Sequence, residues 1–232
     1  MARHKQRQVV RDHSRHRKTH FRLRPGMKPV AYSVSLKYVF IHIPKCAGTS
    51  IHRALRSLHD SRSVPIGTRM YHKHSKASEV RRLLGPAWDQ AFKFSFVRNP
   101  WDLMVSSYHW WLTNARNFPS LVPHASKIRQ MGSFSNFIGS DYGLRMINEQ
   151  DGRDLLDWLC EDDKLIVDFV GRYEALEEDW RQICTHLGVV PITLTRENRV
   201  RREPYRVFYD ETSRRLVADR FAKTIERFGY EF

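Results

Sequence analysis

The sequence predicts an α/β fold, with a mostly parallel β-sheet flanked by helices. Three short apolar segments have the character of strands, near residues 37–43, 91–97 and 166–172, and each precedes a segment with helical apolar spacing. Because such units are joined by right-handed crossovers, we expect the carboxyl ends of the strands to meet at one edge of the sheet. Open α/β folds bind ligands at that edge, so the residues that follow each strand are the functional candidates.

The first strand runs into the nine residues HIPKCAGTS, 42–50. A helix should follow, because Ile51, Ala54, Leu55 and Leu58 fall on one helical face. The backbone N–H groups and dipole of a helix N-terminus favour an anion, and Lys45 adds a positive charge. The nucleotide-triphosphate pattern GxxxxGK[ST] is not matched, because the lysine here precedes the glycine. The sequence therefore predicts an anion-binding loop of another kind.

The second strand alternates phenylalanines over 92–97 and ends at Arg98. Asn99 is a favoured N-cap, Pro100 suits the first helical position, and Asp102 completes a start similar to a capping box. The positions expected to face the core are Val105, Tyr108, Trp111 and Leu112. A second helix N-terminus, with an arginine beside it, is thus predicted at the same sheet edge.

Three further helices are expected. One lies before the second strand and turns Val80, Leu83 and Leu84 inward. The next follows the third strand, with an apolar face of Leu176, Trp180, Ile183 and Leu187, and is stopped by Gly188 and Pro191. The last is capped by Asp210, and its expected core positions are Leu216, Val217, Phe221, Ile225 and Phe228.

The loop and the second motif, in this order and about fifty residues apart, resemble the two phosphate-binding motifs of sulfotransferases that use 3′-phosphoadenosine 5′-phosphosulfate (PAPS). Lys45 followed by Ala47, Gly48, Thr49 and Ser50 resembles the 5′-phosphosulfate loop. Arg98 followed eight residues later by Ser106 resembles the 3′-phosphate site, where a guanidinium binds phosphate oxygens bidentately.

The resemblance runs from about residue 37 to the end, and residues 205–232 are similar to the closing segment of carbohydrate-type sulfotransferases. It implies the P-loop-like sulfotransferase fold, a three-layer sandwich around a central mostly parallel sheet. It also implies roles for the loop. Lys45 would stabilise the bridging oxygen and the leaving 5′-phosphate, while backbone N–H groups and the hydroxyls of Thr49 and Ser50 would cradle the phosphosulfate. Gly48 would allow the backbone to approach it closely.

The resemblance also implies a general base for the acceptor hydroxyl. His74 is the expected base and His72 the second candidate, although some relatives use a carboxylate. A late basic loop would close over the nucleotide, with Arg199, Arg201 and Arg202 as candidates for the 3′-phosphate or for an acidic acceptor. Tyr173 and Glu174 could border the adenine or the acceptor.

The net charge of +15 is uneven, because residues 1–30 carry ten Lys and Arg against one Asp. We therefore divide the chain into a basic N-terminal arm, 1–35, and a sulfotransferase domain, 36–232. The arm could attract a polyanion, or simply act as a solubilising tail. It has no apolar core of a signal peptide, and no stretch of 18 apolar residues occurs. We expect a soluble, cytoplasmic, bacterial enzyme.

The three cysteines form an odd, sparse set that fits a reducing compartment. Cys46 lies inside the anion loop, but the family uses small residues there for close approach of the backbone, so we expect no catalytic thiol. None of the twelve histidines pairs with cysteine at zinc-finger spacing, and sulfuryl transfer from PAPS does not require a bridging magnesium. We expect no metal.

The function that these observations favour is transfer of the sulfuryl group from PAPS to a hydroxyl, with a carbohydrate as the expected acceptor. One alternative is a small-molecule kinase of the P-loop superfamily, which the missing GK[ST] disfavours. Another is a polyanion- or nucleic-acid-binding protein that acts through the basic arm. The acceptor and its sulfated position are not encoded in a readable motif, because acceptor pockets are built by variable loops, here roughly 61–75 and 112–150.

Overall fold

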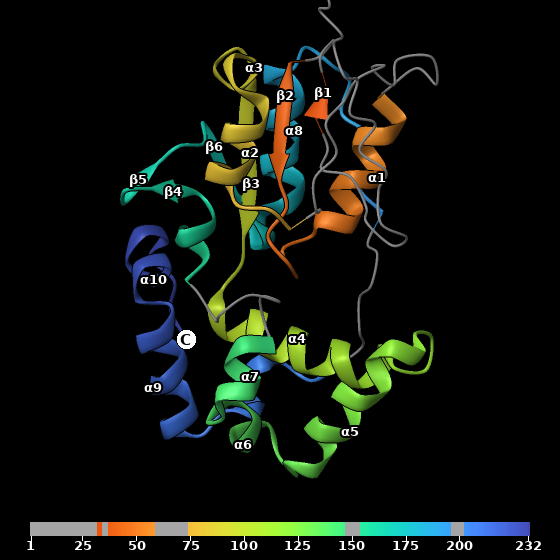
Figure 1. The fold of residues 1–232 in the computed structure, drawn as a ribbon, viewed down its shortest axis with the longest axis vertical. Coiled ribbons are helices and arrows are strands. Elements are labelled where there is room, and N and C mark those ends of the chain that lie inside the picture. Colours follow the sequence, from red (N-terminus) through yellow and green to blue (C-terminus); the bar gives the residue numbers. More distant parts are fainter. Residues whose placement is uncertain (1–31, 34–36, 59–73, 147–153, 196–201) are drawn as a thin grey trace, which may run out of the picture.

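The computed structural model describes residues 32–33, 37–58, 74–146, 154–195 and 202–232. Within these ranges, a four-stranded sheet occupies one half of the molecule and a group of helices the other (Figure 1). The strand order is β1–β2–β3–β6, with bounds β1 Tyr32–Ser33, β2 Tyr38–Ile41, β3 Phe92–Val97 and β6 Phe169–Arg172.

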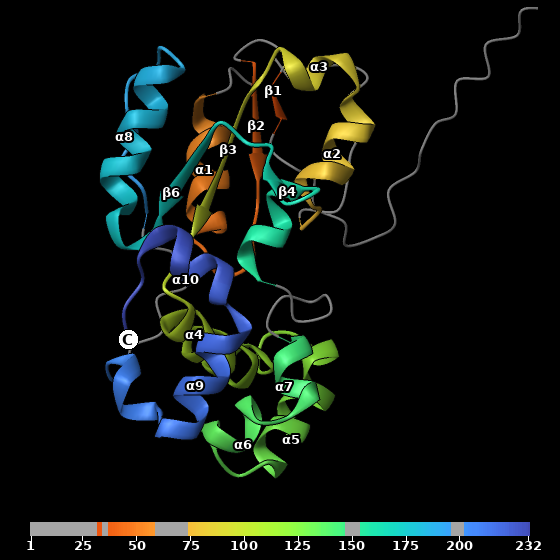
Figure 2. The ribbon, with the colours of Figure 1, turned by 90° about the vertical axis from the view of Figure 1, so that its left-hand side faces the viewer.

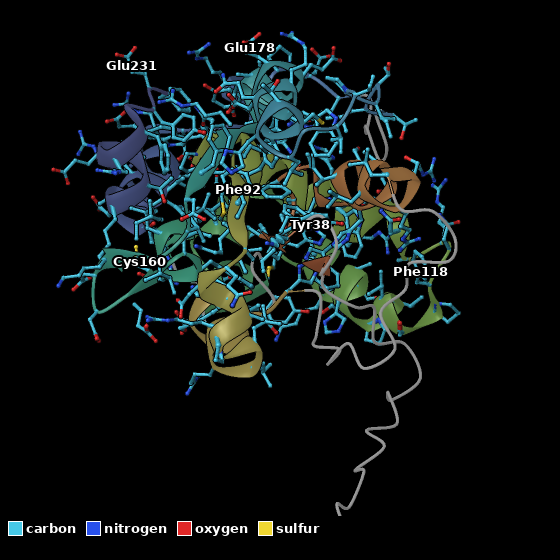
Figure 3. The ribbon with its side chains drawn as sticks, turned by 90° about the horizontal axis from the view of Figure 1, so that it is seen from above. Tyr38, Phe92, Phe118, Cys160, Glu178 and Glu231 are labelled. Carbon is cyan, nitrogen blue, oxygen red and sulfur yellow. The ribbon has the colours of Figure 1, made fainter. Side chains whose placement is uncertain are left out.

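The three predicted strands are confirmed as parallel neighbours, with Phe40 opposite Phe94 and Phe96 opposite Gly171. All of β2 is buried, as expected for a strand covered on both faces. The antiparallel edge strand β1 was not predicted, because two residues are too few to show an apolar period. Figure 3 looks down on the amino ends of β2 and β3, where Tyr38 and Phe92 are register partners.

Helices cover both faces of the sheet, which confirms the predicted arrangement of helices around a central sheet (Figures 1 and 2). The helices α1 (Gly48–Leu58) and α8 (Leu176–His186) lie on one face, and α2 (Ala77–Leu84) and α3 (Pro86–Asp89) on the other. Trp180 of α8 and Trp88 of α3 are both buried and fill the two interfaces.

The carboxyl ends of β2, β3 and β6 point toward the helical half of the molecule (Figure 1). Its helices are α4 Pro100–Asn114, α5 Val122–Gln130, α6 Phe134–Ile138, α7 Asp141–Met146, α9 Glu211–Arg220 and α10 Ala222–Phe228. Single 3-10 turns occur at η1 Pro119–Leu121, η2 Leu155–Trp158, η3 Tyr173–Ala175 and η4 Tyr205–Phe208. A small ribbon pairs β4 Cys160–Glu161 with β5 Lys164–Leu165.

Two core assignments from the sequence were wrong. Leu83 of α2 and Leu216 of α9 are exposed, at 39% and 38%, because each of these helices buries only a narrow stripe. The prediction of a single closing helix was also wrong. The helix is interrupted at Phe221, which separates α9 from α10 and whose ring is buried. Asp210 does cap α9, through a reciprocal capping box with Ser213.

Candidate active site

The loop between β2 and α1 folds back on itself before the helix begins. Lys45 and Ala47 both have positive φ, 65° and 62°, although neither is glycine. Left-handed residues next to right-handed ones turn successive backbone N–H groups into one concavity, which suits an anion. The amides of Gly48 and Thr49 open α1 and have no acceptor within the helix. The first turn of α1 has no acidic side chain, so the positive end of its dipole is retained.

Gly48 is required here by a neighbouring side chain. A Cβ atom built at this position would lie 1.7 Å from Nε2 of His42. The His42 ring is buried, and its Nδ1 lies 3.2 Å from Nε2 of His52 on α1. The prediction that Gly48 gives an anion close access to the backbone stays untested, and the packing of His42 supplies a second reason for glycine.

Arg98, at the end of β3, is the most connected side chain of the site. Its Nη1 donates to the Lys45 carbonyl at 3.0 Å and to Oγ of Ser106 at 3.1 Å. Tyr173 stacks on its guanidinium, with 3.9 Å between Cζ and the ring centroid. The structure therefore brings together the two predicted anion motifs, although they are 53 residues apart in the chain.

Asp102 joins Arg98 to the late basic segment. It accepts hydrogen bonds from Arg98 through Oδ2 and from Arg202 through Oδ1. Burial alone would raise the pKa of the Asp102 carboxyl, but the charges and hydrogen bonds of Arg98 and Arg202 outweigh burial and hold that pKa below its ordinary value. The predicted capping-box role of Asp102 was wrong, because the cap of α4 is the Asn99 side chain alone.

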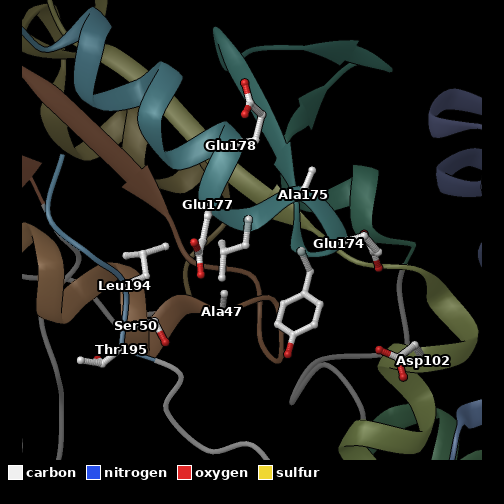
Figure 4. A pocket seen from close by; sticks show the side chains of 11 residues that line it. Ala47, Ser50, Asp102, Glu174, Ala175, Glu177, Glu178, Leu194 and Thr195 are labelled. Carbon is white, nitrogen blue, oxygen red and sulfur yellow. The ribbon is translucent and has the colours of Figure 1, made fainter.

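Two pockets meet at this network. One, of about 470 Å³, lies between the loop and the amino end of α8 and is lined by Ala47, Ser50, Glu177 and Thr195, among others (Figure 4). The other, of about 500 Å³, lies over Arg98, Ser106 and Arg202. Both share Asp102, Tyr173 and Glu174 as walls. Together they offer a continuous surface with the loop residues Ala47 and Ser50 at one end and Arg98 and Arg202 at the other.

A sequence model of the sulfotransferase family matches residues 31–231, nearly the whole chain. The protein belongs to the sulfotransferase family. A protein of Archaeoglobus fulgidus described as uncharacterized is 31% identical over 102 residues, which cover 44% of this chain and 72% of that protein. No solved structure matches the chain significantly. Family membership makes sulfuryl transfer the general activity of the site.

The side chain of Lys45 points to the helical half of the molecule. Nζ of Lys45 lies 5.1 Å from the centroid of the Trp110 ring on α4. Trp101 and Trp111 are buried, whereas Trp110 is partly exposed. The sequence offers Trp101, Trp110 and Trp111 alike as rings that could stack on a sugar, because helical spacing does not show which of them is exposed.

His74 lies beside the loop but below the surface. It is 4% exposed, its Nδ1 lies 3.1 Å from the carbonyl oxygen of His42, and the two rings are 4.5 Å apart between centroids. It lines neither of the two pockets described above. Its role as the base therefore stays a prediction. The other predicted residues His72, Arg199 and Arg201, and most of the basic arm, lie outside the described residues.

Cys46 is packed inside the loop, with 1% of its surface exposed. Burial raises the pKa of its thiol far above the ordinary value and outweighs the positive charges of Arg98 and Lys45. The thiol is therefore protonated at neutral pH, which is consistent with a packing role.

Glu174 is a structural carboxylate at the end of β6. It accepts the Asn99 backbone N–H at 2.7 Å and the Tyr230 hydroxyl at 3.1 Å. In the part of the chain that the structure describes, no group of three or more His, Cys, Asp or Glu side chains is arranged to hold a metal ion, and no helix has the length and apolar character to cross a membrane.

Proposed function

We propose that this sulfotransferase uses PAPS as the donor and transfers its sulfuryl group to a hydroxyl of a carbohydrate acceptor. The carbohydrate class rests on the resemblance of residues 205–232 to the closing segment of carbohydrate-type sulfotransferases. The donor rests on the geometry of the two anion motifs.

One observation carries the donor assignment. Arg98 contacts both the hydroxyl of Ser106 and the carbonyl of Lys45, so the segment that we propose for the 3′-phosphate adjoins the loop that we propose for the 5′-phosphosulfate. A nucleotide with anionic groups on both its 3′ and 5′ positions fits such a surface, whereas an ordinary adenylate would leave the arginine end without an anion. The cluster of Arg98, Ser106 and Arg202 supports this choice, because guanidinium groups form charge-assisted hydrogen bonds with phosphate oxygens.

The chain's own residues then have separate tasks. The backbone amides of Ala47, Gly48 and Thr49 would hold the anion at the amino end of α1, with the Ser50 hydroxyl beside them, because the Ser50 amide donates to the Ala47 carbonyl. Lys45 would stabilise the negative charge that grows on the leaving 5′-phosphate, which is the main electrostatic demand of such a transfer. Residues of the 98–106 segment would bind at a distance from the reacting atoms and fix the donor in line with the acceptor.

His74 is our proposed base for the acceptor hydroxyl. The proposal rests on the resemblance, which implies that a histidine of this region removes the acceptor proton, and the structure places His74 beside His42 at the start of the loop. The variant His74→Asn should lower kcat by about 10²–10⁴-fold with little change in donor affinity. His186→Asn, on a histidine stacked on Phe92 near the opposite end of the strands, is the matched control. An unchanged kcat in His74→Asn would transfer the role to His72 or to a carboxylate.

The donor is tested by calorimetry with adenosine 3′,5′-bisphosphate beside adenosine 5′-phosphate. A charge-assisted hydrogen bond contributes about 1.5–3 kcal/mol, so the wild-type protein should prefer the bisphosphate by about 10- to 100-fold. Ser106→Ala should reduce this preference by about fivefold, because one neutral hydroxyl donor is lost. Thr113→Ala, which removes an exposed hydroxyl of the same helix, should leave the preference intact.

Equal affinity for the two nucleotides would refute the PAPS assignment. In that case, magnesium-dependent turnover of ATP would be the next assay, because a P-loop kinase is the competing enzyme class. With the preference established, incubation with PAPS and a panel of glycans, phenols and lipid alcohols would test the acceptor class. Sulfation confined to non-carbohydrate acceptors would overturn the carbohydrate part alone.

A further inference from the structure

Arg98 does more than line a pocket, because it reaches the backbone of the loop. Four contacts fix its guanidinium. Nη1 donates to the Lys45 carbonyl at 3.0 Å and to Ser106 at 3.1 Å, while Nε and Nη2 lie 2.8 Å and 2.6 Å from Oδ2 of Asp102. The side chain is 8% exposed and stacks on Tyr173. It is therefore a rigid donor, held from several sides.

The carbonyl that Arg98 binds belongs to a residue in an unfavourable conformation. Lys45 has φ 65°, a region that residues with a Cβ atom enter only when their surroundings hold them there. Ala47, two residues on, has φ 62°. These two residues give the loop the concave shape in which its amides converge. The hydrogen bond from Arg98 holds the first of them from outside the loop.

The same guanidinium is tied to the late segment of the chain. The second carboxylate oxygen of Asp102 pairs with Arg202, so Arg202, Asp102, Arg98 and the Lys45 carbonyl form one connected polar chain. This chain runs from the arginine end of the site to the loop end. A change at one end therefore has a direct physical route to the other.

We propose that Arg98 is a positioning residue for loop 42–47, in addition to the 3′-phosphate role that rests on the proposed function. Arg98 keeps the Lys45 peptide in its left-handed conformation and thereby preforms the site for the 5′ anion. Loss of Arg98 should then weaken the binding of ligands that have no 3′-phosphate. Loss of Ser106, which contacts the same Nη1 group but not the loop, should not.

Cys46 gives a reporter within the loop, because it is 1% exposed while Cys184 in α8 is 0% exposed. The experiment measures the rate of maleimide labelling at each cysteine by peptide mass spectrometry. In Arg98→Ala, the ratio of the Cys46 rate to the Cys184 rate should rise about tenfold, the effect of losing one charge-assisted hydrogen bond. In Ser106→Ala, that ratio should equal the wild-type value.

Arg98→Lys is the second variant, since an ammonium group cannot span Asp102 and the Lys45 carbonyl as the guanidinium does. It retains the charge and should still raise the ratio. An unchanged ratio in both Arg98 variants would overturn the proposal. The ratio would also stay unchanged if the whole domain loosened and both labelling rates rose by the same factor, and that result would overturn the proposal as well.

A ligand without a 3′-phosphate supplies the second readout. The affinity for adenosine 5′-phosphosulfate should fall about tenfold in Arg98→Ala and stay unchanged in Ser106→Ala. Equal affinities in wild type and Arg98→Ala would overturn the positioning role. If the wild-type protein binds neither this nucleotide nor adenosine 3′,5′-bisphosphate, the proposed donor fails, and the cysteine labelling still decides whether Arg98 holds the loop.

Discussion

The two regions proposed to bind anions differ in the groups that form them. The loop at residues 42–50 relies on backbone amides, two left-handed residues and the packing of His42 on Gly48. The segment from Arg98 to Ser106 relies on charged and hydroxyl side chains that project from one end of a strand and one face of a helix.

The two regions are held in place by different interactions. The Gly48 end of the loop is fixed by its packing against His42, so it should be sensitive to the addition of a single methyl group. The segment from Arg98 to Ser106 is fixed by ion pairs, so it should tolerate small changes in volume and respond to charge. Arg98 is the point at which the two regions meet.

The largest expected effect is a loss of kcat when Lys45, the lysine of the loop, is replaced. Lys45→Met should lower kcat by about 10²–10³-fold, because it removes stabilisation of the developing charge, while affinity for adenosine 3′,5′-bisphosphate changes much less. Lys127→Met is the matched control. Lys127 belongs to α5, and its ammonium group also lies over an aromatic ring, that of Tyr142. A fall in affinity with an unchanged kcat would show that Lys45 only binds the donor.

A steric test of the loop is expected to be next in size. Gly48→Ala should lower the free energy of unfolding by about 1–3 kcal/mol, because the new Cβ overlaps the His42 ring. Thermal unfolding measures this loss. The double variant His42→Ala with Gly48→Ala should recover most of it, and failure to recover would show that the backbone, not the ring, forbids a side chain.

The charged region can be tested through Asp102. Asp102→Asn should lower the free energy of unfolding at pH 7 by on the order of 1–3 kcal/mol, because Arg98 and Arg202 lose a shared partner. The lowered pKa of Asp102 means that its stabilisation is full above the ordinary value of 3.8 and is lost as pH falls through the folded-state pKa. The difference in the free energy of unfolding between wild type and variant should therefore shrink as the pH falls below about 4.

Urea unfolding at a series of pH values measures this gap. Asp89→Asn, which removes an exposed carboxylate of α3, is the matched control. A gap that stays constant down to about pH 3 would show that Asp102 contributes through hydrogen-bond geometry and not through its charge.

The smallest expected effect is a change in donor affinity on replacing Trp110, whose ring lies under Nζ of Lys45. Trp110→Leu removes a cation–π contact worth about 0.5–1 kcal/mol, so donor affinity should change by only a few-fold. Tryptophan fluorescence of the wild-type protein should change when adenosine 3′,5′-bisphosphate binds, provided that Lys45 leaves the ring for the ligand. A spectrum that does not respond in wild type would argue that Lys45 keeps its place on Trp110.

The sequence allowed the strands, the first helix and the cap at Asn99 to be predicted because their signals are local. Apolar alternation and an Asn–Pro pair act over a few residues, and tertiary packing did not override them. The family resemblance was readable for the same reason, since each phosphate motif is a contiguous string.

The linkage between those strings was not predictable. Nothing in the residue types of Lys45 or Ala47 signals a left-handed backbone, because glycine and asparagine are the usual indicators. The bond from Arg98 to the Lys45 carbonyl joins positions 53 apart. Asp102 at four residues from Arg98 did carry a signal for an ion pair, but the capping interpretation competed with it.

Residues 230–232 determine when the site can form during protein synthesis. The Asn99 side chain donates to the Glu231 carbonyl at 2.9 Å, across 132 positions of the chain, and the Tyr230 hydroxyl binds Glu174. On the ribosome, both anion motifs emerge long before these partners, so a nascent chain halted ahead of Tyr230 lacks the contacts that fix the start of α4. The proposed donor surface should therefore form fully only when residues 230–232 have left the exit tunnel and can dock.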